Sequence, residues 1–149
     1  MDVADRTEDP PGLLMRDVSR AGHELGRTIL GGLPPRLTIG ALLERRIRDE
    51  VAAYNRDPGT IYVGFVQPED AMRYSDGHRM RRPRTLDADR FVLAARQAVE
   101  VGLLSFRIGG RVDGRVDGET VGDLDLEVAP AELEEIVAVM ERPVVARDA

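Results

Sequence analysis

The sequence contains no cysteine and no lysine, and these two absences remove several kinds of chemistry. Without cysteine the chain has no disulfide, no thiolate nucleophile and no cysteine-ligated zinc. All 21 basic residues are arginine, so a Schiff-base lysine and the lysine of a phosphate-binding loop are excluded as well. The sequence therefore rules out thiol redox chemistry and covalent catalysis by a side-chain amine.

Histidines, serines and long apolar runs are also scarce. The two histidines, His23 and His78, are not spaced as a pair of metal ligands, and no serine lies in a Gly-x-Ser-x-Gly motif. The longest uncharged run has 11 residues, from Pro58 to Pro68, whereas a membrane-spanning helix needs about 20. We therefore predict no catalytic residue, no metal site, no cofactor, no membrane contact and a cytoplasmic location.

The apolar content is sufficient for one folded domain. Leu, Ile, Val and Phe make up 27% of the 149 residues, above the roughly 20% below which disorder is expected. Residues 1–12 are acidic, contain two prolines and lack the apolar core of a signal peptide. We therefore predict a disordered acidic tail over 1–12 and a single α+β domain over 13–146.

The clearest local pattern is an amphipathic helix that follows Thr38. Apolar residues recur at helical spacing from Ile39 to Tyr54, Thr38 can cap the first turn, and residues 55–59 end the helix. The opposite face is expected to be solvated and to carry pairs of opposite charge four residues apart. These pairs are Glu44 with Arg48, Arg45 with Asp49, and Arg46 with Glu50.

A second helix and several strands are predicted around it. The helix opens at Thr85 or Asp87 and runs to residue 100 or 101, with Gly102 as its stop. Residues 13–30 indicate a hairpin, and the apolar run 61–66 a short strand followed by a long loop. A further strand begins at Leu104 and ends at Gly109, after which the glycine repeat 110–122 indicates a hairpin tip or a flexible loop.

The segment 130–142 fits two structures. Pro130 at a first-turn position and the helical spacing of Leu133, Ile136, Val137 and Met140 favour a helix that Pro143 stops. The β-branched residues of the same segment favour a closing strand. The sequence leaves both alternatives open.

Charge is concentrated in two opposite segments. Residues 113–135 hold nine carboxylates and one arginine, but Arg115 and Leu124 stand where a calcium loop that begins at Asp113 needs ligands. Residues 73–84 have a net charge of +4, and guanidinium groups suit phosphates or an acidic partner. The acidic segment is itself a possible partner of this basic loop. The candidate binding residues in the loop are His78, Arg79, Arg81, Arg82 and Arg84.

Several short motifs are spread over residues 36–128, roughly 60% of the chain. They are Arg36-Leu37-Thr38, Glu50-Val51, Tyr54-Asn55, Val66-Gln67-Pro68-Glu69-Asp70-Ala71, Gly77-His78-Arg79-Met80-Arg81-Arg82-Pro83-Arg84 and Leu124-Asp125-Leu126-Glu127. In these motifs the chain resembles a family of small uncharacterised bacterial proteins that are similar to ubiquitin-like proteins. The resemblance implies an N-terminal hairpin, a helix and further strands, and it implies no catalytic residue. The chain departs from the ubiquitin-like pattern in its last residues, Val144 to Ala149, which contain no Gly-Gly, so we expect reversible binding and no conjugation.

The periodicities support an α+β domain with two helices and four or five short strands. With the resemblance, they predict a β-grasp (ubiquitin-like) domain with a helical insertion. A ferredoxin-like α/β sandwich is the alternative, which a helix over 130–142 would favour.

Three functions are compatible with the sequence. The first is a non-enzymatic interaction or adaptor module of ubiquitin-like type, which presents a sheet face or edge to a protein partner. The second is a binder of phosphate, nucleotide or RNA through the basic loop, although the net charge of −6 opposes attraction of a nucleic acid. The third is a hydrolase or metal enzyme that uses His23 and His78. Because no catalytic motif is present, the sequence favours the first function.

Overall fold

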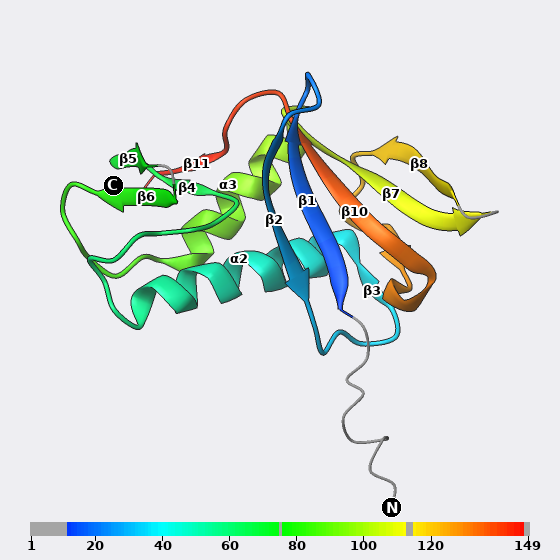
Figure 1. The fold of residues 1–149 in the computed structure, drawn as a ribbon, viewed down its shortest axis with the longest axis horizontal. Coiled ribbons are helices and arrows are strands. Elements are labelled where there is room, and N and C mark those ends of the chain that lie inside the picture. The colour runs from blue at the N-terminus through cyan, green and yellow to red at the C-terminus, as the bar shows by residue number, and fades with distance from the viewer. Residues whose placement is uncertain (1–11, 75, 113–114, 148–149) are drawn as a thin grey trace, which may run out of the picture.

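The structure, a computed structural model, describes residues 12–74, 76–112 and 115–147, except for the side chains of residues 110–119. It has an α+β fold in which a five-stranded mixed sheet is combined with two α-helices (Figure 1). Residues 1–11 lie outside the described residues, so the disordered tail stays a prediction.

The sheet consists of β1 (Leu13–Ser19), β2 (Glu24–Leu30), β7 (Leu104–Val112), β8 (Arg115–Val121) and β10 (Leu133–Met140). Their spatial order is β2-β1-β10-β7-β8. The central pair β1 and β10 is parallel, and the other neighbours are antiparallel. The predicted hairpin over 13–30 is therefore confirmed, and the first and last long strands of the chain lie side by side.

The two helices begin and end where the sequence indicates. Helix α2 (Ile39–Asn55) is capped by the Thr38 hydroxyl, which accepts a hydrogen bond from the backbone N–H of Ala41 at 3.0 Å. Helix α3 (Ala88–Glu100) is capped by Asp87, and Gly102 follows it with a φ of 80°, a conformation that glycine adopts without strain. Both predicted helices are confirmed.

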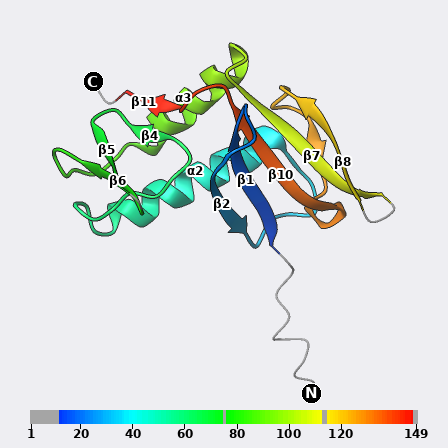
Figure 2. The same ribbon diagram turned by 45° about the horizontal axis from the view of Figure 1, so that its top comes forward.

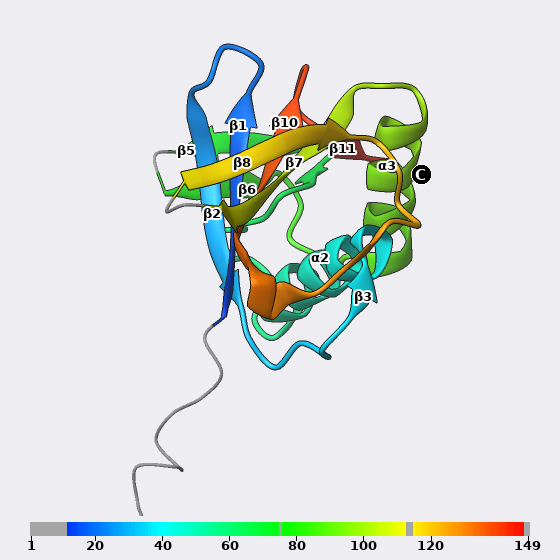
Figure 3. The ribbon, with the colours of Figure 1, turned by 90° about the vertical axis from the view of Figure 1, so that its right-hand side faces the viewer.

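The core lies between the sheet and the two helices. Figure 3 shows α2 and α3 on one side of the sheet, and they pack against each other. Met15, Phe106 and Ile136 project from the sheet into the same cluster as the apolar faces of the helices. The Tyr62 ring packs edge-on against Tyr54 and Phe91, with ring centroids 5.8 and 5.9 Å apart. Burial of these large side chains is the main force that holds the layers together.

The segment between the two helices forms an insertion beside the β2 edge of the sheet (Figure 2). It contains β4 (Gln67–Pro68) and a hairpin of β5 (Ala71–Tyr74) and β6 (Gly77–Met80). Strand β4 pairs in parallel with β11 (Val145–Ala146), and β3 (Leu37–Thr38) pairs with β9 (Glu127–Val128). The sequence missed the β5–β6 hairpin, because its strands have only four residues each and carry no clear alternation.

The predicted strand over 61–66 is wrong. Only Tyr62 forms a bridge, with His78, and the rest of the run is irregular. At Gly64 the backbone turns back and passes so close to the Tyr62 ring that an added Cβ would overlap it. A chain that turns back in this way cannot continue as a strand. Because Tyr62, Phe65 and Val66 are buried, the apolar run contributes to the core without joining a sheet.

Two other predictions are also corrected by the sheet. Strand β7 does not end at Gly109 but continues to Val112. The glycine repeat therefore supplies residues to both arms of the β7–β8 hairpin, whose residues 113–114 lie outside the described residues.

The segment 130–142 is a short 3₁₀ turn, η1 (Pro130–Glu132), followed by strand β10. The helix alternative is wrong because the β-branched residues of β10 are paired on both sides. The condition that favoured a ferredoxin-like sandwich is therefore not met.

A buried arginine connects the sheet, helix α2 and the insertion. Arg46 is only 2% exposed and forms two hydrogen bonds to the Asp17 carboxylate, at 2.6 and 2.7 Å. Its Nε donates to Glu50 at 3.1 Å, and the other Glu50 oxygen accepts the backbone N–H of Phe65 at 2.8 Å. The Arg46 guanidinium also lies 5.0 Å from the centre of the Phe65 ring. The sequence correctly predicted the Arg46–Glu50 pair but placed it wrongly on the solvated face.

The Arg46–Asp17 pair gives a stability prediction. We expect Asp17→Asn to lower the free energy of unfolding by about 1.5–3 kcal/mol, because it places an amide N–H donor where a carboxylate oxygen accepted a hydrogen bond from the buried guanidinium, while Glu50 stays as the counter-charge. The control is Asp49→Asn, which breaks the exposed Arg45–Asp49 pair and should cost at most about 1 kcal/mol. Urea denaturation of both variants measures the difference, and equal losses would contradict this role of Asp17.

Candidate interaction surfaces

The predicted binding residues lie on or just after the β5–β6 hairpin. We call residues 71–82 the basic hairpin, since four arginines there outnumber one acidic residue, Asp76. His78 lies on β6 and lines a groove beside the hairpin, whereas Arg81 and Arg82 are exposed after the end of the strand. The Arg79 guanidinium lies 5.7 Å from the centre of the Tyr74 ring. Of the predicted binding residues only His78 lines the groove, together with Arg73, which the prediction did not include.

The ion pairs described for the acidic segment reach arginines outside the basic loop. Arg84 pairs with Asp70 at 3.0 Å. Glu127 and Glu135 of the acidic segment pair with Arg36 and Arg16, which lie elsewhere. The sequence shows two segments of opposite net charge, but the register of β10 and β9 decides which arginines the acidic residues reach. The proposed match between the two segments is therefore not found among these ion pairs.

The groove beside the basic hairpin has a volume of about 290 Å³. It is bounded by residues Leu25 to Arg27 of β2, by helix α2 and by the insertion. The Arg46–Asp17–Glu50 cluster lines it, and Gly26 leaves room for this cluster, since a Cβ there would lie 3.3 Å from an Asp17 oxygen. Three large apolar side chains on its walls remain solvent-exposed. They are Leu25, Val63 and Tyr74, at 47%, 67% and 44% exposure.

The groove changes the acidity of the groups that line it. Burial raises the pKa of Asp17 and of Glu50 above their ordinary values, while the Arg46 guanidinium acts in the opposite direction on both. The pKa of His78 is lowered, first by burial and second by the positive charge of Arg73. A neutral His78 is therefore favoured in the folded protein, and its imidazole can both donate and accept a hydrogen bond.

The second surface is the face of the sheet opposite the helices. Successive side chains of β1 and β10 point to opposite faces of the sheet. The side chains that point away from the core are those of Arg16, Val18, Val137 and Val139. Figures 1 and 3 show no helix over this face in the described part of the chain. We call it the open face.

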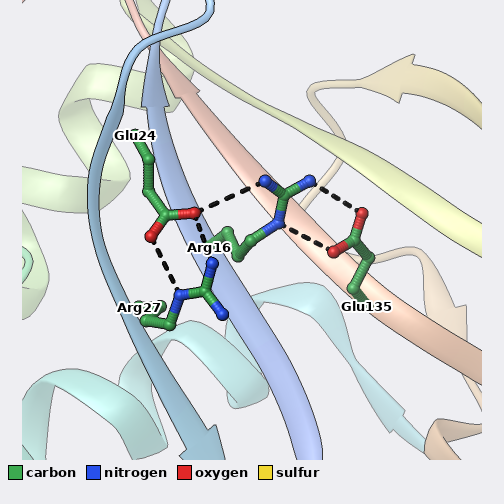
Figure 4. A network of polar contacts seen from close by, with 4 residues as sticks. All are labelled: Arg16, Glu24, Arg27 and Glu135. Carbon is green, nitrogen blue, oxygen red and sulfur yellow. Dashed lines mark hydrogen bonds and ion pairs between the residues drawn. The ribbon is translucent and has the colours of Figure 1, made fainter.

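Ion pairs cross the open face from β2 to β10 (Figure 4). Arg16 on β1 forms a two-pronged pair with Glu135 on β10, at 2.8 and 3.0 Å, and lies 3.5 Å from Glu24 on β2. Glu24 also accepts two hydrogen bonds from Arg27, at 2.9 and 2.7 Å, which lowers the pKa of its carboxyl. The network holds long side chains in fixed positions across three strands.

Sequence reasoning missed most residues of both surfaces. The alternation of β1 could have placed Arg16 on an outer face, but its partner Glu135 is 119 positions away. Leu25, Val63 and Tyr74 come from three separate segments that nothing in the local sequence connects.

The structure also locates the groups that the enzyme hypothesis needs. His23 lies in the turn between β1 and β2 and does not line the groove, whereas His78 does. Within residues 12–74, 76–112 and 115–147, no three metal-ligating side chains are grouped to hold an ion. In the same residues no helix has both the length and the apolar character that crossing a membrane requires.

Comparison with known proteins gives no relative: no family model, no curated protein and no solved structure matches the chain. The resemblance drawn from the short motifs therefore stays a prediction. The groove and the open face are therefore the features from which a function can be inferred.

The lowered pKa of His78 gives a prediction on pH. Above about pH 6.5, its ordinary value, His78 is neutral in both the folded and the unfolded chain. As the pH falls, the unfolded chain takes up the proton first, so the free energy of unfolding should decrease below that pH. Urea denaturation at about pH 7.5 and about pH 5.5 should show a smaller loss in His78→Gln than in the unmodified protein. His23→Gln is the matched control, and an equal effect of the two substitutions would contradict the assignment to His78.

Proposed function

We propose that this protein is a non-enzymatic interaction module of the ubiquitin-like, β-grasp type, which binds a protein partner through the open face of its sheet. The strand order supports the β-grasp interpretation. An N-terminal hairpin is followed by a helix across one face, and the last long strand returns parallel to the first, between β1 and β7. Helix α3 and the basic hairpin are then the insertion. A cytoplasmic location is part of the same proposal.

The observation that carries the proposal is the uncovered, mixed composition of the open face. The apolar side chain of Ile29 is 69% exposed there, and Val139, which is half-buried, lies near the Arg16–Glu135 pair, whereas Val18 and Val137 on the same face are buried. Apolar contacts surrounded by charged groups are typical of surfaces that bind another protein. The fixed ion pairs add specificity, because a partner must match the alternation of charge from β2 to β10.

The proposal predicts that substitutions on the open face abolish partner binding. Ile29→Asp and, separately, Arg107→Glu alter exposed positions on β2 and β7. We expect the tagged protein to retain a specific partner from cells of its source, and both variants to lose it. Leu93→Asp, an equally drastic change at an exposed position of helix α3, should retain the same partner. Quantitative mass spectrometry of the bound proteins measures this. Retention by both open-face variants, with loss by Leu93→Asp, would refute the proposal.

One observation supports a second candidate, a binder of phosphate, nucleotide or RNA. Arg79 lies over Tyr74, and Arg81 and Arg82 are exposed just after β6, a set of groups that suits stacked bases and phosphates. This function requires binding of a fluorescent RNA that weakens steeply as salt rises. It also requires that Arg81→Glu combined with Arg82→Glu abolishes the binding.

A further inference from the structure

We propose that the groove between β2 and the basic hairpin binds an extended acidic peptide segment, which adds a strand to the free edge of β2. This site is separate from the open face and does not depend on it. It uses three features that meet in one place: unpaired strand backbone, exposed apolar walls and positive charge.

The first feature is the edge of β2. Strand β2 is the terminal strand of the sheet and pairs only with β1 among the described strands. Residues Leu25 to Arg27 border the groove, and Gly26, which has no side chain, does so with its backbone. An edge strand presents backbone N–H and C=O groups that an extended peptide can pair with, which is the usual route of strand addition. The other edge strand, β8, does not border this groove.

The second feature is the apolar exposure of the walls. Leu25 on β2, Val63 on the irregular run and Tyr74 on β5 are all exposed, although they line a concave site. Exposed apolar groups gathered in a groove mark a binding site more often than the same groups scattered singly. The volume of about 290 Å³ can accept an apolar side chain from alternate positions of an added strand, because successive side chains of a strand point to opposite sides.

The third feature is the charge of the basic hairpin. Arg73 lines the groove, and Arg79, Arg81 and Arg82 extend the positive charge along the hairpin, although the whole chain is acidic. The other two arginines of the groove are already engaged, Arg27 with Glu24 and Arg46 with Asp17. Charge complementarity therefore favours carboxylates on the peptide that reach Arg73 and its neighbours.

A nucleic acid fits the same groove less well. Asp76 also lines the groove and would repel a nucleic acid, which carries a phosphate at every nucleotide. A peptide can place its carboxylates toward Arg73 only, and its backbone amides and carbonyls match the β2 edge, which a nucleic acid cannot do. The observations therefore favour the peptide.

The probe for the test is a short fluorescent peptide in which acidic residues alternate with leucine, and its binding is measured by fluorescence polarisation. We expect the peptide to bind the full chain, and Arg73→Glu to weaken it by about tenfold or more, since the change replaces attraction by repulsion. Arg107→Glu is the matched control, because it makes the same change on the open face and should leave peptide binding unaltered. N-methylation of alternate peptide amides, on the side that pairs with β2, should abolish binding.

A second measurement uses the unmodified protein and so does not depend on the folding of a variant. Saturating peptide should slow the hydrogen exchange of β2 backbone amides, because the added strand covers that edge. Exchange in the β7–β8 hairpin, at the opposite edge of the sheet, should not change. Loss of the cellular partner in Arg107→Glu with intact peptide binding would show that the open face and the groove act separately.

Four results would overturn the proposal. They are absence of peptide binding to the full chain, equal binding by Arg73→Glu, tighter binding of an RNA that the same variant abolishes, and peptide binding only after residues 1–11 are removed. The last result is included because residues 1–11 are themselves acidic. It would identify them as the occupant of the groove, in place of a partner.

Discussion

Arg46 is a permanent cation in the interior of the protein, and the positions of three separate segments depend on it. Its guanidinium binds Asp17 on β1 and Glu50 on its own helix, and Glu50 in turn holds the backbone of Phe65 in the insertion. A buried charge is tolerated only when its hydrogen bonds are satisfied. Helix α2, strand β1 and the irregular run must therefore keep one relative arrangement.

The groove follows from this constraint. Because the carboxylates of Asp17 and Glu50 are occupied by Arg46, they line the groove without offering it much free negative charge. The insertion is held near β2 but does not pair with it, which leaves the strand edge and the side chains of Leu25 and Val63 uncovered. On the other side of the same sheet, Arg16 is held by exposed and half-buried carboxylates. The two surfaces therefore differ: one is a concave site with an open backbone edge, and the other is a flat face with a fixed pattern of charge.

Much of the fold could be predicted from the sequence, and the errors have identifiable causes. Both helices, the cap at Thr38 and the first hairpin are encoded by neighbouring residues, and all are present. The run 61–66 was wrongly predicted as a strand, because a high apolar content indicates burial but not the path of the chain. The backbone turns at Gly64, which lies close to the Tyr62 ring. The segment 130–142 has apolar residues at helical spacing and also several β-branched residues. It forms a strand because it pairs with β1 on one side and with β7 on the other. Of the candidate binding residues, the sequence located the basic hairpin, but it could not find the groove walls.

By itself the sequence determined which chemistry is absent, since no fold can supply a thiolate or a lysine amine that the chain lacks. It also determined the local elements, because capping, helical periodicity and turn formation act over a few residues. Only the tertiary structure decided the order of the strands, the burial of Arg46 and the meeting of β2 with the basic hairpin. Each of these depends on contacts between distant residues, such as the 29 positions between Asp17 and Arg46 or the 119 between Arg16 and Glu135. The energy of such contacts is set by packing and by exclusion of water, which exist only once the chain has folded.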